Sequence, residues 1–261
     1  MTLVEKRSPL QIWGDVIFAI FLREIKSQFS DKLGIAWSII SPVAFIMILS
    51  VMRGRFDGGE THTIPTFFFM SYAMLLVIFF MGLVPTVAGA IKKNKPLFAF
   101  RQVQPISGVI AIAGFELLIK VFVYLVIFII CYFISLKVEI ADPLKVISIL
   151  FQVWLFSTSI GLILSIIICY IPEVQKILGL VMRPMFFVSG VFFSLQDIPK
   201  EYWHYLTWNP LLHAVELTRY AAYPCYGNAG VSEFYLNMFT LCAVFLALAC
   251  YHVSWKQAIS R

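Results

Sequence analysis

The sequence predicts an all-α polytopic membrane protein, and three observations lead to this prediction. Of its 261 residues, 61% are hydrophobic and only 13% are charged, whereas soluble domains carry roughly 45–50% apolar and about 25% charged residues. The mean hydropathy is +0.89. The apolar residues form long unbroken runs, which argues against the alternating pattern of a spanning β-barrel. A soluble enzyme, a disordered tail and a nucleic-acid-binding domain are therefore disfavoured.

Six stretches are apolar enough to cross a membrane, since a spanning helix needs about 20 such residues. They are Leu33–Met52, Thr66–Ile91, Ile106–Leu136, Leu144–Ile171, Ile177–Phe193 and Phe234–Trp255. The third would form a helix about 46 Å long, against ~30 Å of hydrocarbon. Either this helix breaks, or its first turns lie at the cytoplasmic interface. Pro105, Ser107 and Gly108 resemble a helix start and favour the second alternative.

The basic residues predict the orientation. The net charge is +6, and in membrane proteins Lys and Arg concentrate in cytoplasmic loops. With a cytoplasmic N-terminus, twelve Lys and Arg residues fall in inside loops and six in outside loops. We therefore expect a single membrane domain over residues 1–261, with both termini in the cytoplasm.

The segment 10–30 precedes the first span and is too polar to be one. Ile12, Val16 and Ile20 follow one side of a helix, whereas charged residues that include Arg23 and Lys26 interrupt the apolar run. This pattern predicts an amphipathic helix in the cytoplasmic interface. A peripheral anchor is the simpler interpretation, and a role in admitting substrate is the alternative.

Charged residues inside spans are rare and mark candidate functional positions. Glu116 and Lys120 are four residues apart, so they share a helix face and can pair, either structurally or on a substrate path. Arg183 has no obvious local partner and either reaches the cytoplasmic face or lines a cavity for an anionic substrate. The spans hold so few acidic residues that a proton- or sodium-driven carrier is disfavoured.

The cytoplasmic loop 92–104 mixes basic and aromatic residues. Its candidate docking residues are Lys92, Lys93, Asn94, Lys95, Leu97, Phe98, Phe100 and Arg101. Exposed aromatics flanked by charge suggest a surface for another protein. Interfacial anchoring by Phe, with ordinary cytoplasmic charge, is the alternative.

The outside segment 194–227 is too polar for a span and too apolar for a solvated loop. It predicts two short helices that dip into the outer leaflet. Asp197 would cap the first, with Pro199 in its first turn, and Asn209–Pro210 would start the second, which Pro224 ends. The candidate gate residues here are Tyr202, Trp203, Tyr205, Trp208 and Arg219. A passive aromatic belt is the alternative, and a metal or hydrolytic site at His204 and His213 is disfavoured because the spacing matches no ligand set.

Two further patterns bear on mechanism and packing. The phosphate-binding motif G-x-x-x-x-G-K-[ST] is absent from the sequence, so the chain lacks the usual cradle for ATP phosphates. Ser157, Gly161 and Ser165 form a stripe of small residues at intervals of four, which predicts a close helix contact within the chain.

Together these motifs resemble the permease subunit of type-two ABC exporters, and most closely the capsular-polysaccharide export branch. FLREIKSQFSDKLGIAWSIISPV, with Arg23 and Trp37, resembles the family's approach to its first span. NKPLFAFRQVQPIS resembles its coupling region, and SGVFFSLQDIPKEYWHYLTWNPLLHAVELTRYAAYP its outside hairpin. Ser107 departs from the pattern, because Asp is expected there.

The resemblance implies a homodimeric channel in the inner membrane of a Gram-negative bacterium. Two cytoplasmic ABC ATPase subunits, which bind ATP and Mg, would dock on the coupling region, so this chain would be a transporter without an ATPase site or cofactor of its own. A periplasmic adaptor and an outer-membrane channel would complete the path of a polysaccharide, mostly acidic and lipid-linked. The resemblance favours docking for the loop 92–104 and a gate for the outside aromatics. An O-antigen or teichoic-acid exporter, or a lipid or drug flippase, is the alternative.

Overall fold

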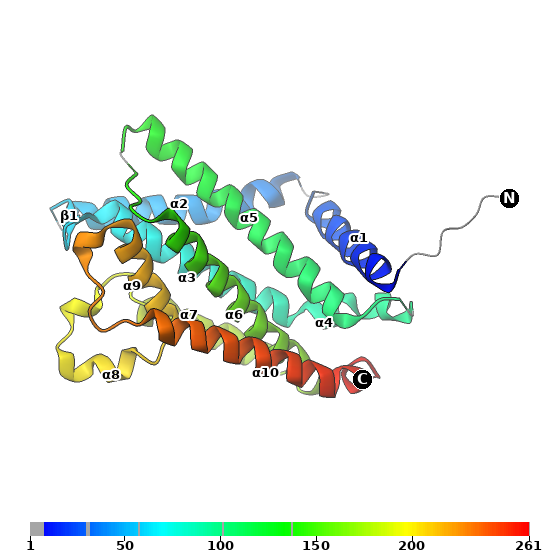
Figure 1. Ribbon diagram of the computed structural model, residues 1–261. Helices are drawn as coiled ribbons and strands as arrows, with labels where there is room; N and C mark the ends of the chain where they lie inside the picture. The colour runs from blue at the N-terminus through cyan, green and yellow to red at the C-terminus, as the bar shows by residue number, and fades with distance from the viewer. Residues whose placement is uncertain (1–7, 30–31, 57, 101, 137, 261) are drawn as a thin grey trace.

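The computed structural model describes residues 8–29, 32–56, 58–100, 102–136 and 138–260, and Figure 1 shows an α-helical bundle. Its elements in chain order are α1 Pro9–Phe29, α2 Lys32–Phe56, β1 Glu60–Thr61, β2 Ile64–Pro65, α3 Thr66–Ala88, α4 Ala90–Asn94, η1 Lys95–Ala99, α5 Pro105–Phe133, α6 Pro143–Tyr170, α7 Val174–Val188, η2 Leu195–Asp197, η3 Lys200–Tyr202, α8 Trp203–Leu206, α9 Pro210–Ala222, η4 Pro224–Tyr226 and α10 Glu233–Ser260.

Five of the described helices are long and apolar enough to cross a membrane, namely α2, α3, α5, α6 and α10. They correspond to five of the six predicted spans. The predicted fifth span, Ile177–Phe193, corresponds to the shorter α7, which ends at Val188. At ~1.5 Å per residue α7 is about 22 Å long, less than the ~30 Å of a hydrocarbon core. Gly190 explains the early end, because its φ of 74° lies in the left-handed region that terminates helices.

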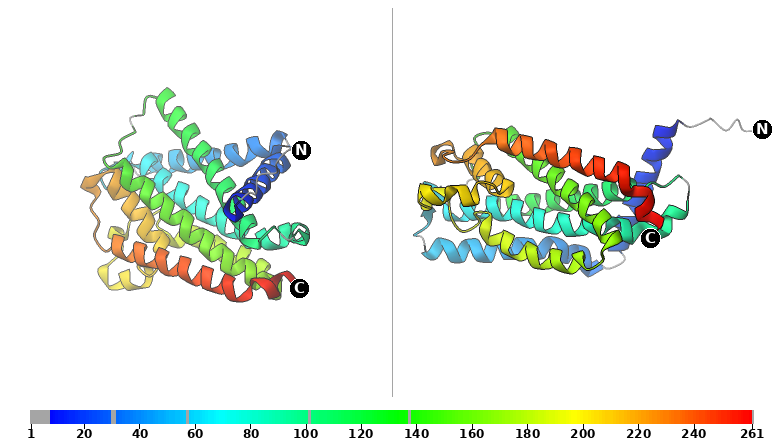
Figure 2. Two further views of the ribbon diagram at one scale, coloured as in Figure 1. Left: turned by 45° about the vertical axis from the view of Figure 1, so that its right-hand side comes forward. Right: turned by 90° about the horizontal axis from the view of Figure 1, so that it is seen from below.

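The chain nevertheless returns from one end of the bundle to the other through α7 and the segment that follows it. The two ends of the described chain, at the start of α1 and the end of α10, lie at the same end of the bundle, near α4, whereas β1, α8 and α9 lie at the opposite end (Figures 1 and 2). The turn between α6 and α7 lines a shallow pocket together with Lys92 of α4, so α7 starts at the end with the termini. The elements from η2 to η4, which directly follow α7, lie at the other end.

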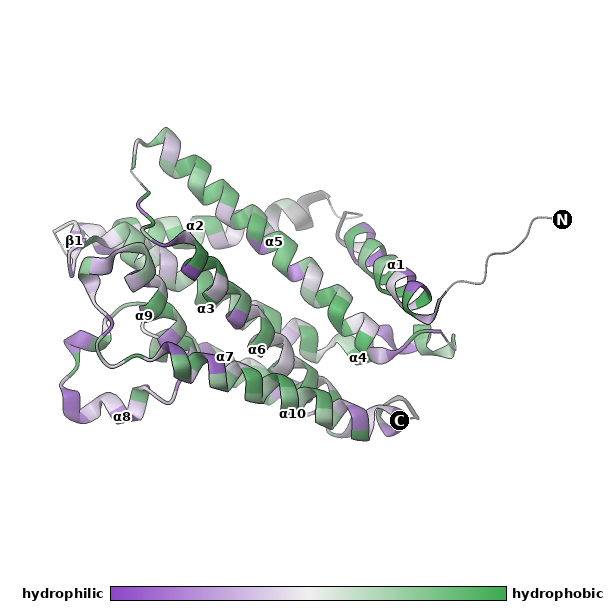
Figure 3. Ribbon diagram, viewed as in Figure 1, coloured by the Kyte–Doolittle hydropathy of each residue, from purple (hydrophilic) through white to green (hydrophobic). Residues whose placement is uncertain are grey.

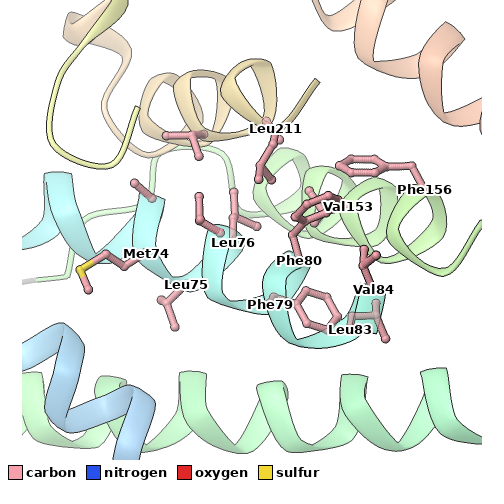
Figure 4. Close-up of a cluster of buried hydrophobic side chains, with 14 of the residues drawn as sticks. Met74, Leu75, Leu76, Phe79, Phe80, Leu83, Val84, Val153, Phe156 and Leu211 are labelled. Carbon is pink, nitrogen blue, oxygen red and sulfur yellow. The ribbon is translucent and has the colours of Figure 1, made fainter. Parts of the chain in front are cut away.

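Helix α3 is the centre of the bundle. In its most hydropathic stretch 72% of the residues are buried, against 17% for α2 and for α10. A helix that is apolar all round belongs in an interior, as α3 does. Figure 3 shows a mostly hydrophobic α5 with a few hydrophilic positions, and a mixed surface on α1. Figure 4 shows the side chains of α3 that meet α6 and α9. They include Leu76, Phe80 and Val84, opposite Val153, Phe156 and Leu211.

The stripe of small residues in α6 makes the predicted contact within the chain. Ser157, Gly161 and Ser165 are buried. A Cβ atom at Gly161 would lie 2.7 Å from Cβ of Val87 on α3, and the Oγ of Ser165 accepts a 3.2 Å hydrogen bond from the backbone N–H of Ile91. Small side chains here allow the two backbones to approach closely.

Helix α5 is continuous over its 29 residues, so the alternative of a broken third span is wrong. It starts at Pro105, as its sequence predicts, and is inclined to its neighbours (Figures 1 and 2). The indole N–H of Trp154 on α6 donates a 2.9 Å hydrogen bond to the carbonyl of Ala113. This bond joins α5 and α6 on the side of the termini, and the two helices diverge toward the other end.

Because α6 and α3 are in close contact at Gly161, we expect Gly161→Ala to destabilise the bundle. The added methyl group would meet Val87 and the carbonyl of Val84, and overpacking of this kind costs about 1–3 kcal/mol. Gly114→Ala in α5 is the control, because a Cβ atom there has no neighbour within 4 Å and Ala favours a helix interior. Thermal unfolding in detergent should show a lower Tm for the first variant alone, and equal shifts would contradict the assignment.

Candidate functional site

At the end with the termini, two polar pairs join the amphipathic helix α1 to the predicted coupling region. The guanidinium of Arg23 donates to Oδ1 of Asn94, and the ammonium of Lys93 pairs with the carboxylate of Glu24. The Glu24 side chain is only 4% exposed, and an unpaired buried charge is very costly. These four residues, named the interface cluster below, therefore hold α1 against α4.

The interface cluster also packs against the start of α5. Asn94 is buried, and its Nδ2 donates a 2.9 Å hydrogen bond to the carbonyl of Ala90. A Cβ atom at Gly108 would lie 2.8 Å from this Nδ2, so only glycine lets α5 approach so closely. Phe21 of α1 packs edge-on against Phe115 of α5, with ring centroids 6.3 Å apart. Helices α1, α4 and α5 therefore meet as one packed unit.

The side chains of the loop 92–104 divide into an exposed set and a half-buried set. Lys92, Lys93 and Lys95 are exposed, and Phe100 is 65% exposed. Phe98 is half-buried against the core, and Leu97 is half-buried as well. Arg101 lies outside the described residues. The free surface is therefore basic, with one projecting aromatic ring.

The charged residues of α5 lie near this junction. Glu116 is within electrostatic range of Lys120, Glu24 and Lys93. Within the described chain, Glu116 and Lys120 share a face of α5 but form no ion pair with each other. Lys26 of α1 and Trp37 of α2 are exposed on the surface of the chain.

At the opposite end, Arg219 of α9 is completely buried between three elements. Its guanidinium donates to the carbonyl oxygens of Gly190 and Val191 at 2.8 and 3.3 Å, just beyond α7, and to that of Phe193 at 3.3 Å. On α3, it bonds the carbonyl of Phe69 at 3.1 Å and lies 3.5 Å from the centre of that ring. Arg219, a gate candidate by sequence, therefore has internal contacts and reaches no surface of this chain.

A buried carboxylate neutralises Arg219. Oε1 of Glu216 accepts a 2.9 Å hydrogen bond from it, and Oε2 accepts one of 2.7 Å from the hydroxyl of Tyr226. The same hydroxyl lies 2.5 Å from Oγ of Ser194. Burial raises the pKa of Tyr226, so this phenol stays protonated. This network connects α9, the turn η4 and the segment after α7.

The outside segment 194–227 differs in part from its prediction. The second helix is confirmed: Asn209 caps α9 by accepting a 3.0 Å bond from the N–H of Leu211, Pro210 is its first residue, and Pro224 begins the next turn. The first predicted helix is instead two 3-10 turns and the short α8. Asp197 does not cap a helix that starts at Pro199. It accepts a 2.8 Å bond from the N–H of Ser194 and lies 2.6 Å from Nε2 of His62.

The aromatic gate candidates occupy two environments. The side chains of Tyr202, Tyr205 and Trp208 are 55%, 64% and 68% exposed. Trp203 is packed instead: its Nε1 donates a 2.8 Å bond to the carbonyl of Ile198, and a Cβ atom at Gly230 would lie 2.5 Å from its ring. Trp203 therefore holds the segment together, whereas the other three rings are available for contact.

Arg183 projects from the surface of α7. This helix buries Leu178, Met182 and Phe186, which recur every four residues along one side, and Arg183 is exposed together with the apolar Leu180 and Phe187. A cation inside a membrane span requires a protein or aqueous neighbour.

The comparisons with known proteins identify the family. The model of the ABC-2 type transporter family matches residues 15–223. The chain belongs to this family. It is 37% identical over 246 residues to the polysialic acid transport protein KpsM of Escherichia coli, covering 94% of this chain and 95% of that protein. It is 24% identical to the capsule polysaccharide export inner-membrane protein CtrC of Neisseria meningitidis serogroup B, over 80% of each chain, and 22% identical to BexB of Haemophilus influenzae, which has the same description, over 82% and 81%.

Some side chains of this ABC-2 family member make contacts that its sequence did not predict. The hairpin of β1 and β2 brings His62, in its turn, to Asp197, and Gly58 and Gly59, which precede β1, were the available signal. His213, a disfavoured ligand candidate, accepts a 3.0 Å bond from the N–H of Ser232 at Nδ1 and bonds the carbonyl of Thr207 through Nε2. Burial lowers its pKa, so it is a neutral structural residue. No three His, Cys, Asp or Glu side chains of the described chain converge as metal ligands.

We expect Arg219→Met to destabilise the outer end strongly, because Glu216 would keep a buried charge without its counter-ion. Breaking such a pair costs about 3–5 kcal/mol. The double variant Arg219→Met, Glu216→Met removes both charges and should recover part of the lost Tm in detergent-purified protein. Hydrogen exchange should be fastest in α9 of the single variant. If the double variant unfolded earlier than Arg219→Met, the buried pair would not be the cause.

Proposed function

We propose that this chain is the membrane subunit of an ATP-driven exporter that moves capsular polysaccharide across the bacterial inner membrane. The observation that carries the proposal is the 37% identity to KpsM, a polysialic acid transport protein, over nearly the whole of both chains. CtrC and BexB, which are named for capsule polysaccharide export at the inner membrane, support the same substrate class.

The energy for transport would come from a separate ABC ATPase, on which ATP and Mg bind. This chain has no phosphate-binding loop of its own. The basic surface of Lys92, Lys93 and Lys95, with the projecting ring of Phe100, is the proposed docking site. Because the interface cluster ties α1 to α4, a displacement of the docked loop would move α1 with it. Helix α1 would then transmit motion from the ATPase to the membrane helices, in addition to serving as a peripheral anchor.

Two copies of this chain would enclose the polysaccharide between them. We propose six crossings, with α7 as the fifth, because the start of α1 and the end of α10 lie at one end of the bundle. The excess of Lys and Arg in the predicted inside loops supports a cytoplasmic position for that end and for both termini. Arg183 would face the channel, where its charge would offset that of an acidic polymer. A second copy would cover exposed apolar residues of α2, which include Ile48.

The outer segment would form the gate of the channel. Tyr202, Tyr205 and Trp208 present exposed rings, and flat aromatic faces stack on the C–H surfaces of sugars. Such weak contacts suit a polymer that slides. A periplasmic adaptor and an outer-membrane channel would receive the polymer in a Gram-negative cell. An O-antigen or teichoic-acid exporter is the second candidate, since the path of these polymers would need the same weak aromatic contacts.

A strain that lacks this gene tests the proposal. We expect polysaccharide to accumulate inside these cells and wild-type protein to restore it to the surface. Trp208→Ala should restore less surface polymer at normal permease abundance, because its exposed ring contacts the substrate. Trp203→Ala should lower abundance itself, because its ring packs on Gly230. Immunoblots and polymer assays of both cell fractions separate these effects, and normal surface polymer in the deletion strain would refute the export function.

Phe100→Asp should prevent co-purification with the ATPase, because a buried charge would replace the aromatic contact at the docking surface. The control is Phe56→Asp, since Phe56 is 82% exposed at the far end of α2. Affinity purification of the complex, followed by quantification of both subunits, provides the measurement. A complex that survives Phe100→Asp at wild-type stoichiometry would rule out this docking surface.

A further inference from the structure

A cavity of about 330 Å³ opens on the side of the bundle, away from the interface cluster and from the aromatic residues of the gate. Its floor is α3, with Phe68, Tyr72 and Leu76 among the buried residues. Helix α5 forms one wall and α6 the other, where these helices diverge (Figure 1). The cavity therefore lies between membrane-spanning helices.

The loop between α5 and α6 closes the cavity at the end with β1 and α9. Val138 and Ile140 line it there. The backbone N–H groups of Ala141 and Asp142 donate to carbonyls of α9 at 3.1 and 2.9 Å, which holds this loop in place. The hydroxyl of Tyr72 donates a 3.1 Å bond to the carbonyl of Glu139 and reinforces the closure. A ligand can then enter only sideways, between α5 and α6.

The chemistry of the lining selects an apolar ligand. The exposed lining is almost entirely carbon. Three of its hydroxyl groups are already bonded within the chain: Ser71 donates to the carbonyl of Phe67 at 2.7 Å, Thr218 to that of Ala214 at 2.8 Å, and Tyr72 to the loop. Apolar cavities of this kind stay dry and bind hydrocarbon. A polysaccharide, which needs many hydrogen bonds, does not match such a wall.

The dimensions match one leaflet of a bilayer. The floor runs from Phe68 to Leu76, which at ~1.5 Å per residue is about 12 Å. Half of a ~30 Å hydrocarbon core is about 15 Å. The mouth is formed by Leu125 and Phe128 of α5 and Ile147 of α6, which are 50%, 56% and 62% exposed and belong to the apolar outer surface of these helices. The hydrocarbon that covers this surface therefore reaches the mouth.

We propose that this cavity is a binding site for one acyl chain of a membrane phospholipid, in the leaflet at the end with β1, α8 and α9. The lipid fills the space between α5, α3 and α6 and so replaces the helix contact that α5 lacks at this end. The site is a second, apolar site that is separate from the polymer path. It does not depend on the proposed export function, because it follows from the lining and from the membrane alone.

Photolabelling tests the proposal in the full-length protein, reconstituted in nanodiscs of phosphatidylethanolamine and phosphatidylglycerol that carry a diazirine on one acyl chain. After irradiation, peptide mass spectrometry should find more lipid adducts on Leu76 and Ile127, which are 2% and 7% exposed, than on Leu246 of α10, which is 54% exposed. Buried residues would exceed an exposed one only if a lipid chain occupied the cavity.

Variants that close the mouth provide the second arm. Leu125→Trp and, separately, Ile147→Trp should reduce the adducts on Leu76 and Ile127 severalfold, whereas the control Leu246→Trp should leave them unchanged. Thermal unfolding of each variant confirms that it is folded. Floor residues labelled no more than Leu246 would overturn the proposal, as would labelling that is insensitive to both mouth variants. The first of these results is also the one expected if a second copy of the chain filled the cavity.

Discussion

The guanidinium of Arg219 is the group on which the end of this protein with β1, α8 and α9 depends. Gly190, Val191 and Phe193 follow α7 and belong to no helix, so no helical N–H group bonds their carbonyls, and buried acceptors without partners are costly. Arg219 satisfies all three, and the carbonyl of Phe69 as well. Its fixed fork of donors makes this possible, since a lysine offers no such geometry. The short α7 and the irregular segment after it are therefore held by one side chain of α9.

This arrangement has an energetic consequence for the elements around it. Taking a cation out of water costs several kcal/mol even in a real protein, and only a close carboxylate and further hydrogen bonds offset that cost. Glu216 supplies the counter-charge, and the hydroxyl of Tyr226 donates a hydrogen bond to the second carboxylate oxygen of Glu216. The aromatic rings of the proposed gate therefore stand on a rigid polar base. This buried network can fix the backbone positions of Tyr202 and Trp208, while their exposed side chains remain free to change conformation.

The sequence predicted what depends on local pattern and missed what depends on distant contacts. Continuous apolar runs located five spans, and Asn209–Pro210 located α9, because a cap and a first-turn proline act within a few residues. The end of α7 was placed too late, since its apolar run continues to Phe193 although the helix stops at Val188. Glu216 and Arg219 are only three residues apart, but their burial depends on carbonyls far along the chain. The pair of Glu24 and Lys93 likewise joins residues 69 positions apart.

The comparison of Arg183 with Arg219 shows why the type of a residue alone could not define the polymer path. By sequence, Arg183 was a candidate for contact with an anionic substrate, and Arg219 was a candidate gate residue. Arg219 has its charge and its donors satisfied inside the chain, so it has little attraction left for a polymer. Arg183 is exposed on a helix that also exposes Leu180 and Phe187. An isolated cation among apolar neighbours attracts an anion over a short range without enclosing it. A polymer that must pass needs such a contact, because a fully formed ion pair at each repeat would hold it in place.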